Sequence, residues 1–202
     1  MSTRALAEAF HDAEFIGGID TSPEMISMAN FIGKYNNVLE AVKNLHSTRM
    51  KDHVALNLVK LAMEVKNSVI RPKYQDSRIA YLRGNAERVM APRGQFDIVT
   101  IMYAFHEIPK IARYRILRET RRLLRPGGIL AIVDINPQDY TPSPTMLAGE
   151  PYVIEYQNNI EKQIGSIQGF RDMNCIDIVP EHVRMWVLKR CHCNPSHEMM
   201  YN

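Results

Sequence analysis

The sequence predicts an α/β protein with a mostly parallel sheet and an antiparallel hairpin near its C-terminal end. Segments with apolar residues at helical spacing alternate with short apolar, β-branched runs through most of the chain. Two of these runs, 96–102 and 128–134, are continuous enough to predict strands that are covered on both faces. The last two runs, 175–179 and 183–188, are separated only by a short turn, which favours a hairpin.

Composition narrows the class of protein. The 202 residues fit one domain of ordinary size, and 46% hydrophobic with 23% charged residues is a globular profile. No run approaches the roughly 18 apolar residues of a membrane-spanning helix, and Glu8 and Asp12 interrupt any signal peptide. Three cysteines do not make a disulfide scaffold, so we expect a cytoplasmic, reducing location. A net charge of +3 does not indicate nucleic acid, which we do not expect as a partner.

The first half of the chain predicts a helix over 2–11, a strand over 14–20 and a second helix that starts at Ser22-Pro23. Serine caps a helix and proline suits its first position. Residues 36–77 predict a helical insertion, because the apolar residues there have helical spacing. Between residues 40 and 78 there are eight Lys or Arg against four Asp or Glu. A solvated helical face explains this excess, and contact with a polyanion or partner is the alternative.

The second half predicts a strand over 78–82 and a helix over 111–124. The Arg-Pro-Gly-Gly turn at 125–128 ends that helix, since proline fixes φ and glycine accepts a positive φ. Residues 136–151 predict a loop, and a long helix follows to about residue 169. We expect residues 191–202 to be a flexible tail. Its Cys-His-Cys sequence lacks a second ligand pair, so we expect no metal site.

Three strand ends carry side chains suited to chemistry, because ligands of parallel sheets bind beyond the carboxyl ends of the strands. The carboxylate of Asp20 suits the hydroxyls of a ribose, or it caps the next helix. Asn85 suits the edge of an adenine, or it is a plain turn residue. His106 can take a proton from a substrate nucleophile, while Glu107 orients it or binds a cationic group. A packed aromatic cluster with a helix-capping acid explains His106 and Glu107 equally well.

Four segments in order resemble the class I S-adenosylmethionine-dependent methyltransferases. They are DTSPEM at 20–25, GNAE at 84–87, FDIVTIMYAFHE at 96–107 and LLRPGGILAIVD at 123–134. The resemblance is closest to the small-molecule branch that includes the ubiquinone/menaquinone-biosynthesis type. It covers 2–35 and 78–190 and implies one domain over 1–190, with 36–77 as an insertion. It also implies a Rossmann-like sheet with strand order 3-2-1-4-5-7-6 and strand 7 antiparallel.

The resemblance implies S-adenosylmethionine as the cofactor and methyl transfer to an O, N, S or C atom of a small molecule. The residues carried over to cofactor binding are Asp20, Thr21, Met25, Asn85, Ala86, Met102 and Tyr103. Asp20 is implied to bind the ribose, Thr21 and Met25 to lie along the adenosine, and Asn85 and Ala86 to face the adenine edge. Met102 and Tyr103 are implied to lie below the methionine part. His106 is implied to face the substrate, with Glu107 beside it as the second catalytic candidate.

One departure from the family concerns its first strand and the glycine-rich D-x-G-x-G-x-G loop, which should precede the first helix. Here the sequence starts at Ser2-Thr3-Arg4, where the family has just left that loop. We therefore expect a sheet without its first central strand, in a chain truncated or started too late. The strands ending at Asp20 and Met102 would lie about 9–10 Å apart. Without this buried strand the fold would lose ~10 kcal/mol of hydrophobic stabilisation, which would impair folding and cofactor binding.

Two other functions stay open at this point. A non-catalytic methyltransferase-fold protein would bind a partner through the basic insertion at 36–77. A nicotinamide-dependent dehydrogenase would use Asp20 equally well for NAD, although the Arg-Pro-Gly-Gly turn and the terminal hairpin favour the methyltransferase. The methyl acceptor and the oligomeric state cannot be predicted from the sequence.

Overall fold

A computed structural model describes residues 2–33 and 76–192 of the chain. These residues form two compact units that divide between Asn85 and Ala86, and each unit is described by itself. Nearly all of the predicted insertion at 36–77 and most of the predicted tail at 191–202 lie outside the described residues.

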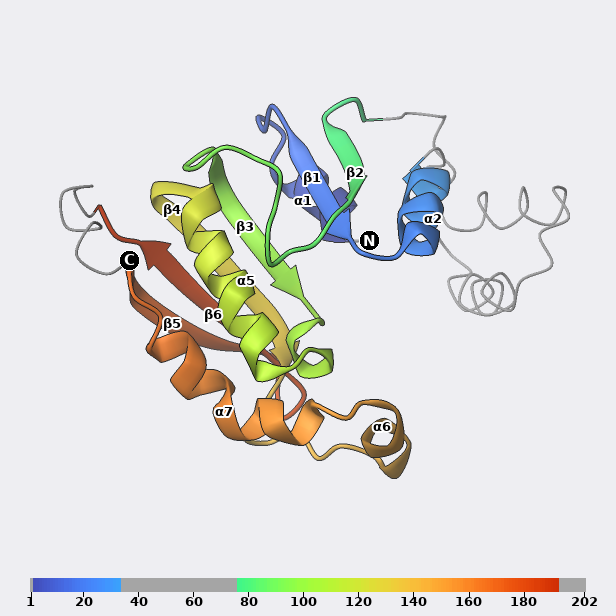
Figure 1. Cartoon of the computed structure of the whole chain (residues 1–202), viewed down its shortest axis with the longest axis vertical. Helices are drawn as coiled ribbons and strands as arrows, with labels where there is room; N and C mark the ends of the chain where they lie inside the picture. The colour runs from blue at the N-terminus through green and yellow to red at the C-terminus, as the bar shows by residue number, and fades with distance from the viewer. Residues whose placement is uncertain (1, 34–75, 193–202) are drawn as a thin grey trace, which may run out of the picture. The chain divides into compact units, whose positions relative to one another are not determined.

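The first unit is a two-stranded parallel sheet with two helices packed on it (Figure 1). Its elements are α1 (Ser2–Ala9), β1 (Ile16–Asp20), α2 (Pro23–Gly33) and β2 (Ile79–Arg83). As predicted, α2 begins at Ser22-Pro23, and the Ser22 hydroxyl accepts the backbone N–H of Met25 at 3.1 Å. Asp20 is the last residue of β1 and pairs in register with Arg83 of β2.

Arg78 ties the end of α1 to the start of β2. Its guanidinium donates to the carbonyl oxygens of Ala7, Phe10 and His11 at 3.0, 2.8 and 2.7 Å. A second contact joins the same guanidinium to the Asp76 carboxylate at 2.7 Å. Carbonyls at the end of a helix have no partner within the helix, so Arg78 supplies the donors that they need.

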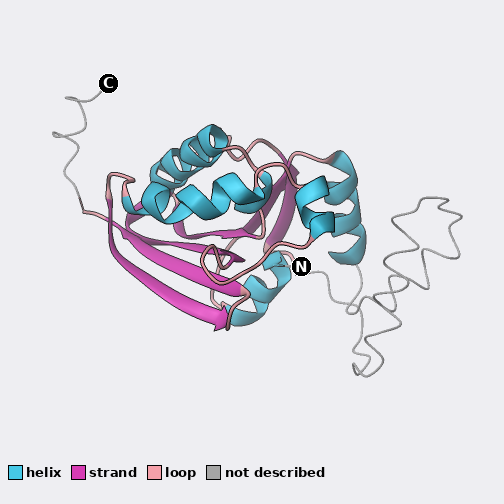
Figure 2. Ribbon diagram, turned by 90° about the horizontal axis from the view of Figure 1, so that it is seen from below, coloured by secondary structure: helices cyan, strands magenta, loops and turns pink. Residues whose placement is uncertain are grey.

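The second unit is a four-stranded sheet in the order β3-β4-β6-β5. The strands are β3 (Phe96–Met102), β4 (Leu124–Ile135), β5 (Phe170–Val179) and β6 (Val183–Arg190). The β3–β4 pair is parallel, and the β4–β6 and β5–β6 pairs are antiparallel. Figure 2 shows α5 (Lys110–Leu123) and α7 (Val153–Gly165) along one face of this sheet. The short elements η1 (Phe105–Glu107) and α6 (Pro144–Gly149) complete the unit.

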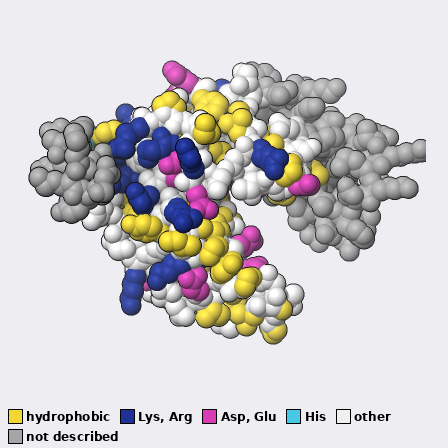
Figure 3. All heavy atoms as spheres, in the orientation of Figure 1, with side chains coloured by type: hydrophobic (Ala, Val, Ile, Leu, Met, Phe, Trp, Pro, Cys, Tyr) yellow, Lys and Arg dark blue, Asp and Glu magenta, His cyan; other side chains and the backbone are white. Residues whose placement is uncertain are grey.

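The core of the second unit lies between this sheet and the two long helices. Leu130 and Ile132 of β4 are fully buried, whereas Ile129, the residue before Leu130, is 38% exposed. This alternation follows from the two-residue period of a strand. Trp186 of β6 and Tyr156 of α7 are also fully buried in the same cluster. Lys110, Arg115 and Arg118 of α5 are exposed. Figure 3 shows Lys and Arg side chains on the face of the second unit that carries α5.

The topology confirms the predicted α/β class with its C-terminal antiparallel hairpin. The order β2-β1 corresponds to strands 3-2 of the family, and β3-β4-β6-β5 corresponds to strands 4-5-7-6. Among the described strands, none corresponds to strand 1. The expected distance of about 9–10 Å across that position stays a prediction.

The Arg-Pro-Gly-Gly segment differs in shape from the predicted tight turn. It ends α5 as expected, but the backbone then runs extended from Leu124, which pairs with Phe96. The next register pair is Ile98 with Ile129, so β4 carries extra residues that bulge out of the ladder. Gly127 takes a φ of +80° in this bulge, as a glycine can do without strain.

Two further expectations are corrected by the structure. Strand β3 has no fully buried residue, because among the described strands it pairs only with β4 and forms an edge of that sheet. The region 136–151 is not all loop, since it contains α6. Ser143 caps this helix by accepting the backbone N–H of Met146, and Pro144 is its first residue.

Candidate active site

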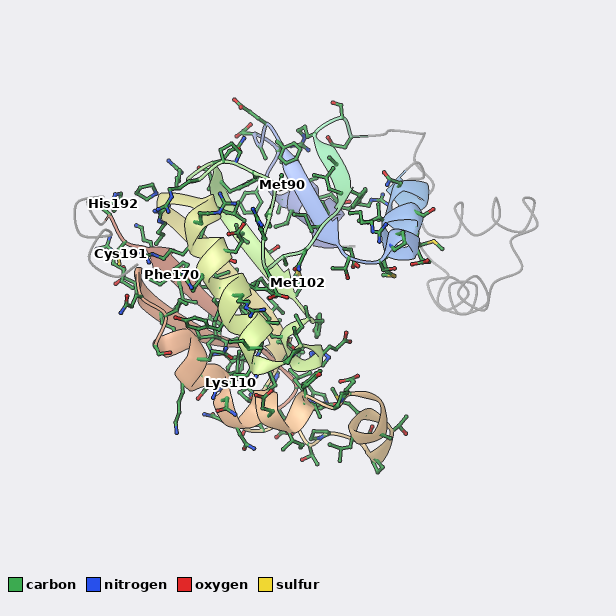
Figure 4. All side chains as sticks on the ribbon, viewed as in Figure 1. Met90, Met102, Lys110, Phe170, Cys191 and His192 are labelled. Atoms are coloured by element: carbon green, nitrogen blue, oxygen red, sulfur yellow. The ribbon has the colours of Figure 1, made fainter. Side chains whose placement is uncertain are left out.

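A sharp turn after β3 creates the candidate site of the second unit. Tyr103 directly follows β3 and has a φ of +49°, which is rare for an aromatic residue. Its backbone N–H donates to the carbonyl of Val133 on β4 at 2.8 Å, so the turn stays attached to the sheet. The chain then enters η1, which carries His106 and Glu107. Figure 4 labels Met102 near the end of β3 and Lys110 at the start of α5, on either side of this turn.

The imidazole of His106 is paired with the carboxylate of Asp134, near the end of β4. His106 Nδ1 lies 2.5 Å from Asp134 Oδ1, and Asp134 is fully buried. The backbone N–H groups of Phe105 and Ile135 donate to the same carboxylate at 2.9 and 2.8 Å. Asp134 therefore fixes both the ring of His106 and the backbone that carries it.

The other ring nitrogen of His106 faces two further carboxylates. Nε2 lies 3.7 Å from Glu107 Oε1 and 3.5 Å from Glu150 Oε2. Burial by itself would lower the pKa of His106, but the Asp134 hydrogen bond and the charges of Asp134, Glu150 and Glu107 outweigh it. The pKa of His106 is therefore raised above its ordinary value.

Arg113 of α5 stabilises the turn by hydrogen bonds to its backbone. Its side chain is fully buried and donates to the carbonyl oxygens of Phe105, at 3.2 Å, and Ile108. The guanidinium Nε also donates to Gln163 of α7 at 3.1 Å. Burial lowers the pKa of Arg113, although Glu155 opposes this effect. Through these contacts, Arg113 links η1 to both α5 and α7.

Tyr156 of α7 packs against His106 on the buried side of the His106–Asp134 pair. Its ring meets that of His106 edge-on, with centroids 6.3 Å apart. Its hydroxyl donates to the carbonyl of Ile135 at 2.8 Å. Burial, together with the charge of Asp134, raises the pKa of Tyr156, so this hydroxyl stays neutral and acts as a donor.

The predicted ribose ligand lies in the first unit, at the carboxyl end of β1. One oxygen of Asp20, Oδ1, accepts the backbone N–H of Ser22 at 2.8 Å, which matches the expected capping role. Within the described ranges, the other oxygen has no hydrogen-bond partner and is available for a ribose hydroxyl. The backbone N–H of Gly84 donates to the Asp20 carbonyl at 2.9 Å, so Asp20 lies beside the turn with Asn85. Thr21 and Met25 are exposed nearby in sequence.

The remaining predicted residues lie in the second unit. Met102 and Tyr103 are 40% and 49% exposed at the end of β3. Ala86 is half-buried and packs against the core of this unit. One continuous segment, the end of β3 and the turn after it, thus carries Met102, Tyr103, His106 and Glu107.

Sequence reasoning did not assign the two carboxylates that complete the cluster. The sequence marks Asp134 as a possible site residue, because it ends an apolar strand as Asp20 does. Glu150 had none, since only the path of the chain after α6 brings it to His106. The same holds for Arg113, whose place in a basic helix gave no sign of full burial.

Part of the chain is similar to known methyltransferases. Residues 40–132 match the family described as a methyltransferase domain. Over 66 residues the chain is 35% identical to an uncharacterized methyltransferase of Synechocystis sp., covering 33% of the chain and 31% of that protein. Over 51 residues it is 43% identical to the ubiquinone/menaquinone biosynthesis C-methyltransferase of Methylobacterium nodulans, covering 25% and 19%. The matched stretches span less than a third of these curated relatives.

Solved structures share the fold at low sequence identity. The phosphoethanolamine N-methyltransferase 2 of Haemonchus contortus, in complex with S-adenosyl-L-methionine, has a TM-score of 0.57 and 14% identity. The alignment covers 93% of this chain and 46% of that one. A SAM-dependent methyltransferase from Aquifex aeolicus has a TM-score of 0.52 and 14% identity over 93% of this chain and 74% of its own.

These likenesses together support a class I S-adenosylmethionine-dependent methyltransferase. The match to the methyltransferase domain starts at residue 40, so the family pattern extends into the segment predicted as an insertion. The bounds of that insertion stay a prediction. None of the helices in the described parts of the chain is long and apolar enough to cross a membrane.

Proposed function

We propose that this methyltransferase moves the methyl group of S-adenosylmethionine to a small-molecule acceptor, with His106 as the general base. The observation that carries the proposal is the buried Asp134–His106 pair, at 2.5 Å. A carboxylate bonded to Nδ1 keeps the proton on that nitrogen and leaves Nε2 to accept one from the acceptor. The same carboxylate stabilises the imidazolium that results.

S-adenosylmethionine, when bound, supplies an electrophilic methyl group on a sulfonium. Asp20 suits the ribose because one of its oxygens has no hydrogen-bond partner among the described residues. In the same unit, we propose that Thr21, Met25 and Asn85 contact the adenosine. In the second unit, we propose that Ala86 contacts the adenine edge and that Met102 and Tyr103 contact the methionine part. His106 itself is only 6% exposed and is held by Asp134, which favours the fixed alignment that such a displacement depends on.

The names of the relatives support an organic acceptor with a hydroxyl or an activated ring. They include methyltransferases of ubiquinone/menaquinone biosynthesis, of phthiotriol and phenolphthiotriol dimycocerosates, and of 27-O-demethylrifamycin SV. A phenol or alcohol needs to lose a proton as it is methylated, and Nε2 of His106 is suited to take it. Glu107 is 61% exposed, and we propose that it helps to orient the acceptor.

The two alternatives from the sequence have less support. The basic insertion that would bind a partner lies outside the described residues, and partner binding does not require a buried histidine–carboxylate pair. The dehydrogenase alternative is not supported by the relatives named above, which are methyltransferases.

A transfer assay with labelled S-adenosylmethionine and a reduced quinone tests the proposal. For the full native protein we expect label in the quinone product. The His106→Asn variant should bind the cofactor normally but transfer the methyl group about 100-fold more slowly, the lower range for a lost general base. His182→Asn is the matched control, because His182 is exposed on the β5–β6 turn. Equal rates for His106→Asn and native protein would exclude the base role, and binding of NAD in place of S-adenosylmethionine would exclude the function.

A further inference from the structure

We propose that His106, Glu107 and Glu150 form a binding site for a divalent transition-metal cation, which blocks the base when bound. The three side chains offer one ligand atom each, and these atoms all lie within 4.8 Å of one another. The inference rests on the His106 role proposed above, because cation and acceptor would compete for the same Nε2 lone pair. Cation binding itself is measured without cofactor or acceptor, so the two proposals can fail separately.

The distances among the ligand atoms suit a bound cation. Zinc binds imidazole nitrogen and carboxylate oxygen at about 2.0–2.2 Å, so two tetrahedral ligands are roughly 3.3–3.6 Å apart. His106 Nε2 lies 3.5 Å from Glu150 Oε2 and 3.7 Å from Glu107 Oε1. The Glu107 and Glu150 oxygens lie within 4.8 Å of each other, so side-chain movement would complete the coordination.

Asp134 holds His106 in the form that a metal ligand requires. A ligating histidine commonly donates its other ring N–H to a carboxylate, which orients the ring and strengthens its lone pair. His106 does so through Nδ1 to Asp134 Oδ1, while only 6% of the residue is exposed. In the neutral imidazole, the Nε2 lone pair then lies within 3.7 Å of two carboxylates. The repulsion is relieved either by a proton on Nε2 or by a cation bound between these groups.

Glu150 provides an independent sign of an unfilled interaction. The Glu150 side chain is 30% exposed, but its Oε2 atom is buried and has no hydrogen-bond partner in the part of the chain that the structure describes. Buried polar atoms nearly always have a partner, because an unpaired one costs free energy. This oxygen is the Glu150 atom that lies 3.5 Å from His106 Nε2. A cation coordinated by both atoms would satisfy it.

The ligand set favours zinc over magnesium. Imidazole suits Zn²⁺ and other transition metals, whereas Mg²⁺ prefers oxygen ligands alone. Three protein ligands leave a fourth position for water. Glu107 is 61% exposed, which gives a cation access from solvent.

Calorimetric titration with ZnCl₂ alone tests the site, on a Cys191→Ser/Cys193→Ser background that removes zinc binding by thiolates of the chain end. We expect one cation per chain. Glu150→Gln and Glu107→Gln should each weaken zinc binding by more than about 10-fold. Loss of a residue that only orients a metal ligand already weakens metal binding by about 10-fold or more, and loss of a ligand itself should weaken it further. Glu181→Gln, at an exposed position on the β5–β6 turn, is the control and should bind zinc normally. MgCl₂ should bind far more weakly.

Equal zinc affinity in Glu150→Gln, Glu107→Gln and their parent would overturn the inference, as would an absence of zinc binding. Cobalt gives a second readout, because Co²⁺ held by nitrogen and oxygen ligands has visible absorption that Glu150→Gln should abolish. Zinc should also inhibit methyl transfer, and a chelator should restore it. Methyl transfer by a protein that binds no zinc would remove the cation site and leave the proposed function intact.

Discussion

His106 Nδ1 lies 2.5 Å from Oδ1 of Asp134, and the two residues come from the carboxyl ends of neighbouring parallel strands. The carboxylate also accepts the N–H of Phe105, the residue before the histidine. One buried acid thus sets the direction of the ring and the path of the backbone. Any role of His106 in catalysis depends on this contact.

Replacing Asp134 should therefore affect catalysis more than cofactor binding. Asp134→Asn keeps the size of the side chain but offers an amide that favours the wrong tautomer of His106. We expect methyl transfer to fall by about 100-fold or more, with the dissociation constant for S-adenosylmethionine unchanged. Steady-state rates and calorimetry on folded variants measure both. Asp139→Asn, in the loop after β4, is the control. An unaltered rate for Asp134→Asn would show that the pair does not position a base.

The raised pKa of His106 predicts the pH dependence of methyl transfer. The His106 imidazole can act as a base only when it is unprotonated, so the rate of methyl transfer should rise with pH. The rate should reach half its maximum above about pH 6.5, because the ordinary pKa of histidine is about 6.5 and that of His106 is raised. The charges that raise the pKa belong to Asp134, Glu150 and Glu107. Glu150→Gln should lower the midpoint of the pH–rate profile. The profile is recorded with a chelator present, and a midpoint unaffected by Glu150→Gln would contradict the assignment.

The same shift predicts how stability depends on pH. A histidine whose pKa is higher in the folded state stabilises the fold fully below about pH 6.5, its unfolded value. This contribution is lost as the pH rises through the raised folded value. The difference in free energy of unfolding between native protein and His106→Asn should therefore shrink from pH 6 to alkaline pH in urea titrations. A difference that grows with pH would mean that the pKa is lowered.

Two arginines of α5 offer a matched test of what holds the η1 turn. Arg113 is fully buried and donates to two backbone carbonyls of the turn region, whereas Arg115 is 61% exposed and pairs with Glu87. Arg113→Met should lower the free energy of unfolding by about 3 kcal/mol, because it leaves buried acceptors without donors. Arg115→Met should change it by less than about 1 kcal/mol. Similar losses in urea-unfolding experiments would show that Arg113 is not a structural support.

Local signals explain which elements could be predicted. The strand over 96–102 matches β3 residue for residue, because its apolar, β-branched run has clear ends. Ser22-Pro23 predicted the start of α2 for a chemical reason that holds in the structure. The same Ser-Pro signal at Ser143-Pro144 marks α6, but the four prolines in 136–151 favoured a loop.

The candidate site was only half predictable for a different reason. His106 and Glu107 stand in a recognisable run after a strand, so their position relative to the sheet followed from the sequence. The contact with Glu150 depends on how the chain returns from α6, and no local pattern determines that path. The bulge in β4 also depends on pairing with β3, which the Arg-Pro-Gly-Gly segment alone does not reveal.

Titration of S-adenosylmethionine and of NAD into the full native protein tests the central claim most directly. We expect saturable binding of S-adenosylmethionine and none of NAD. Asp20→Ala should weaken that binding by about 1.5–3 kcal/mol, the usual scale for a charge-assisted hydrogen bond. Binding of NAD alone, or an S-adenosylmethionine dissociation constant that Asp20→Ala does not change, would contradict it.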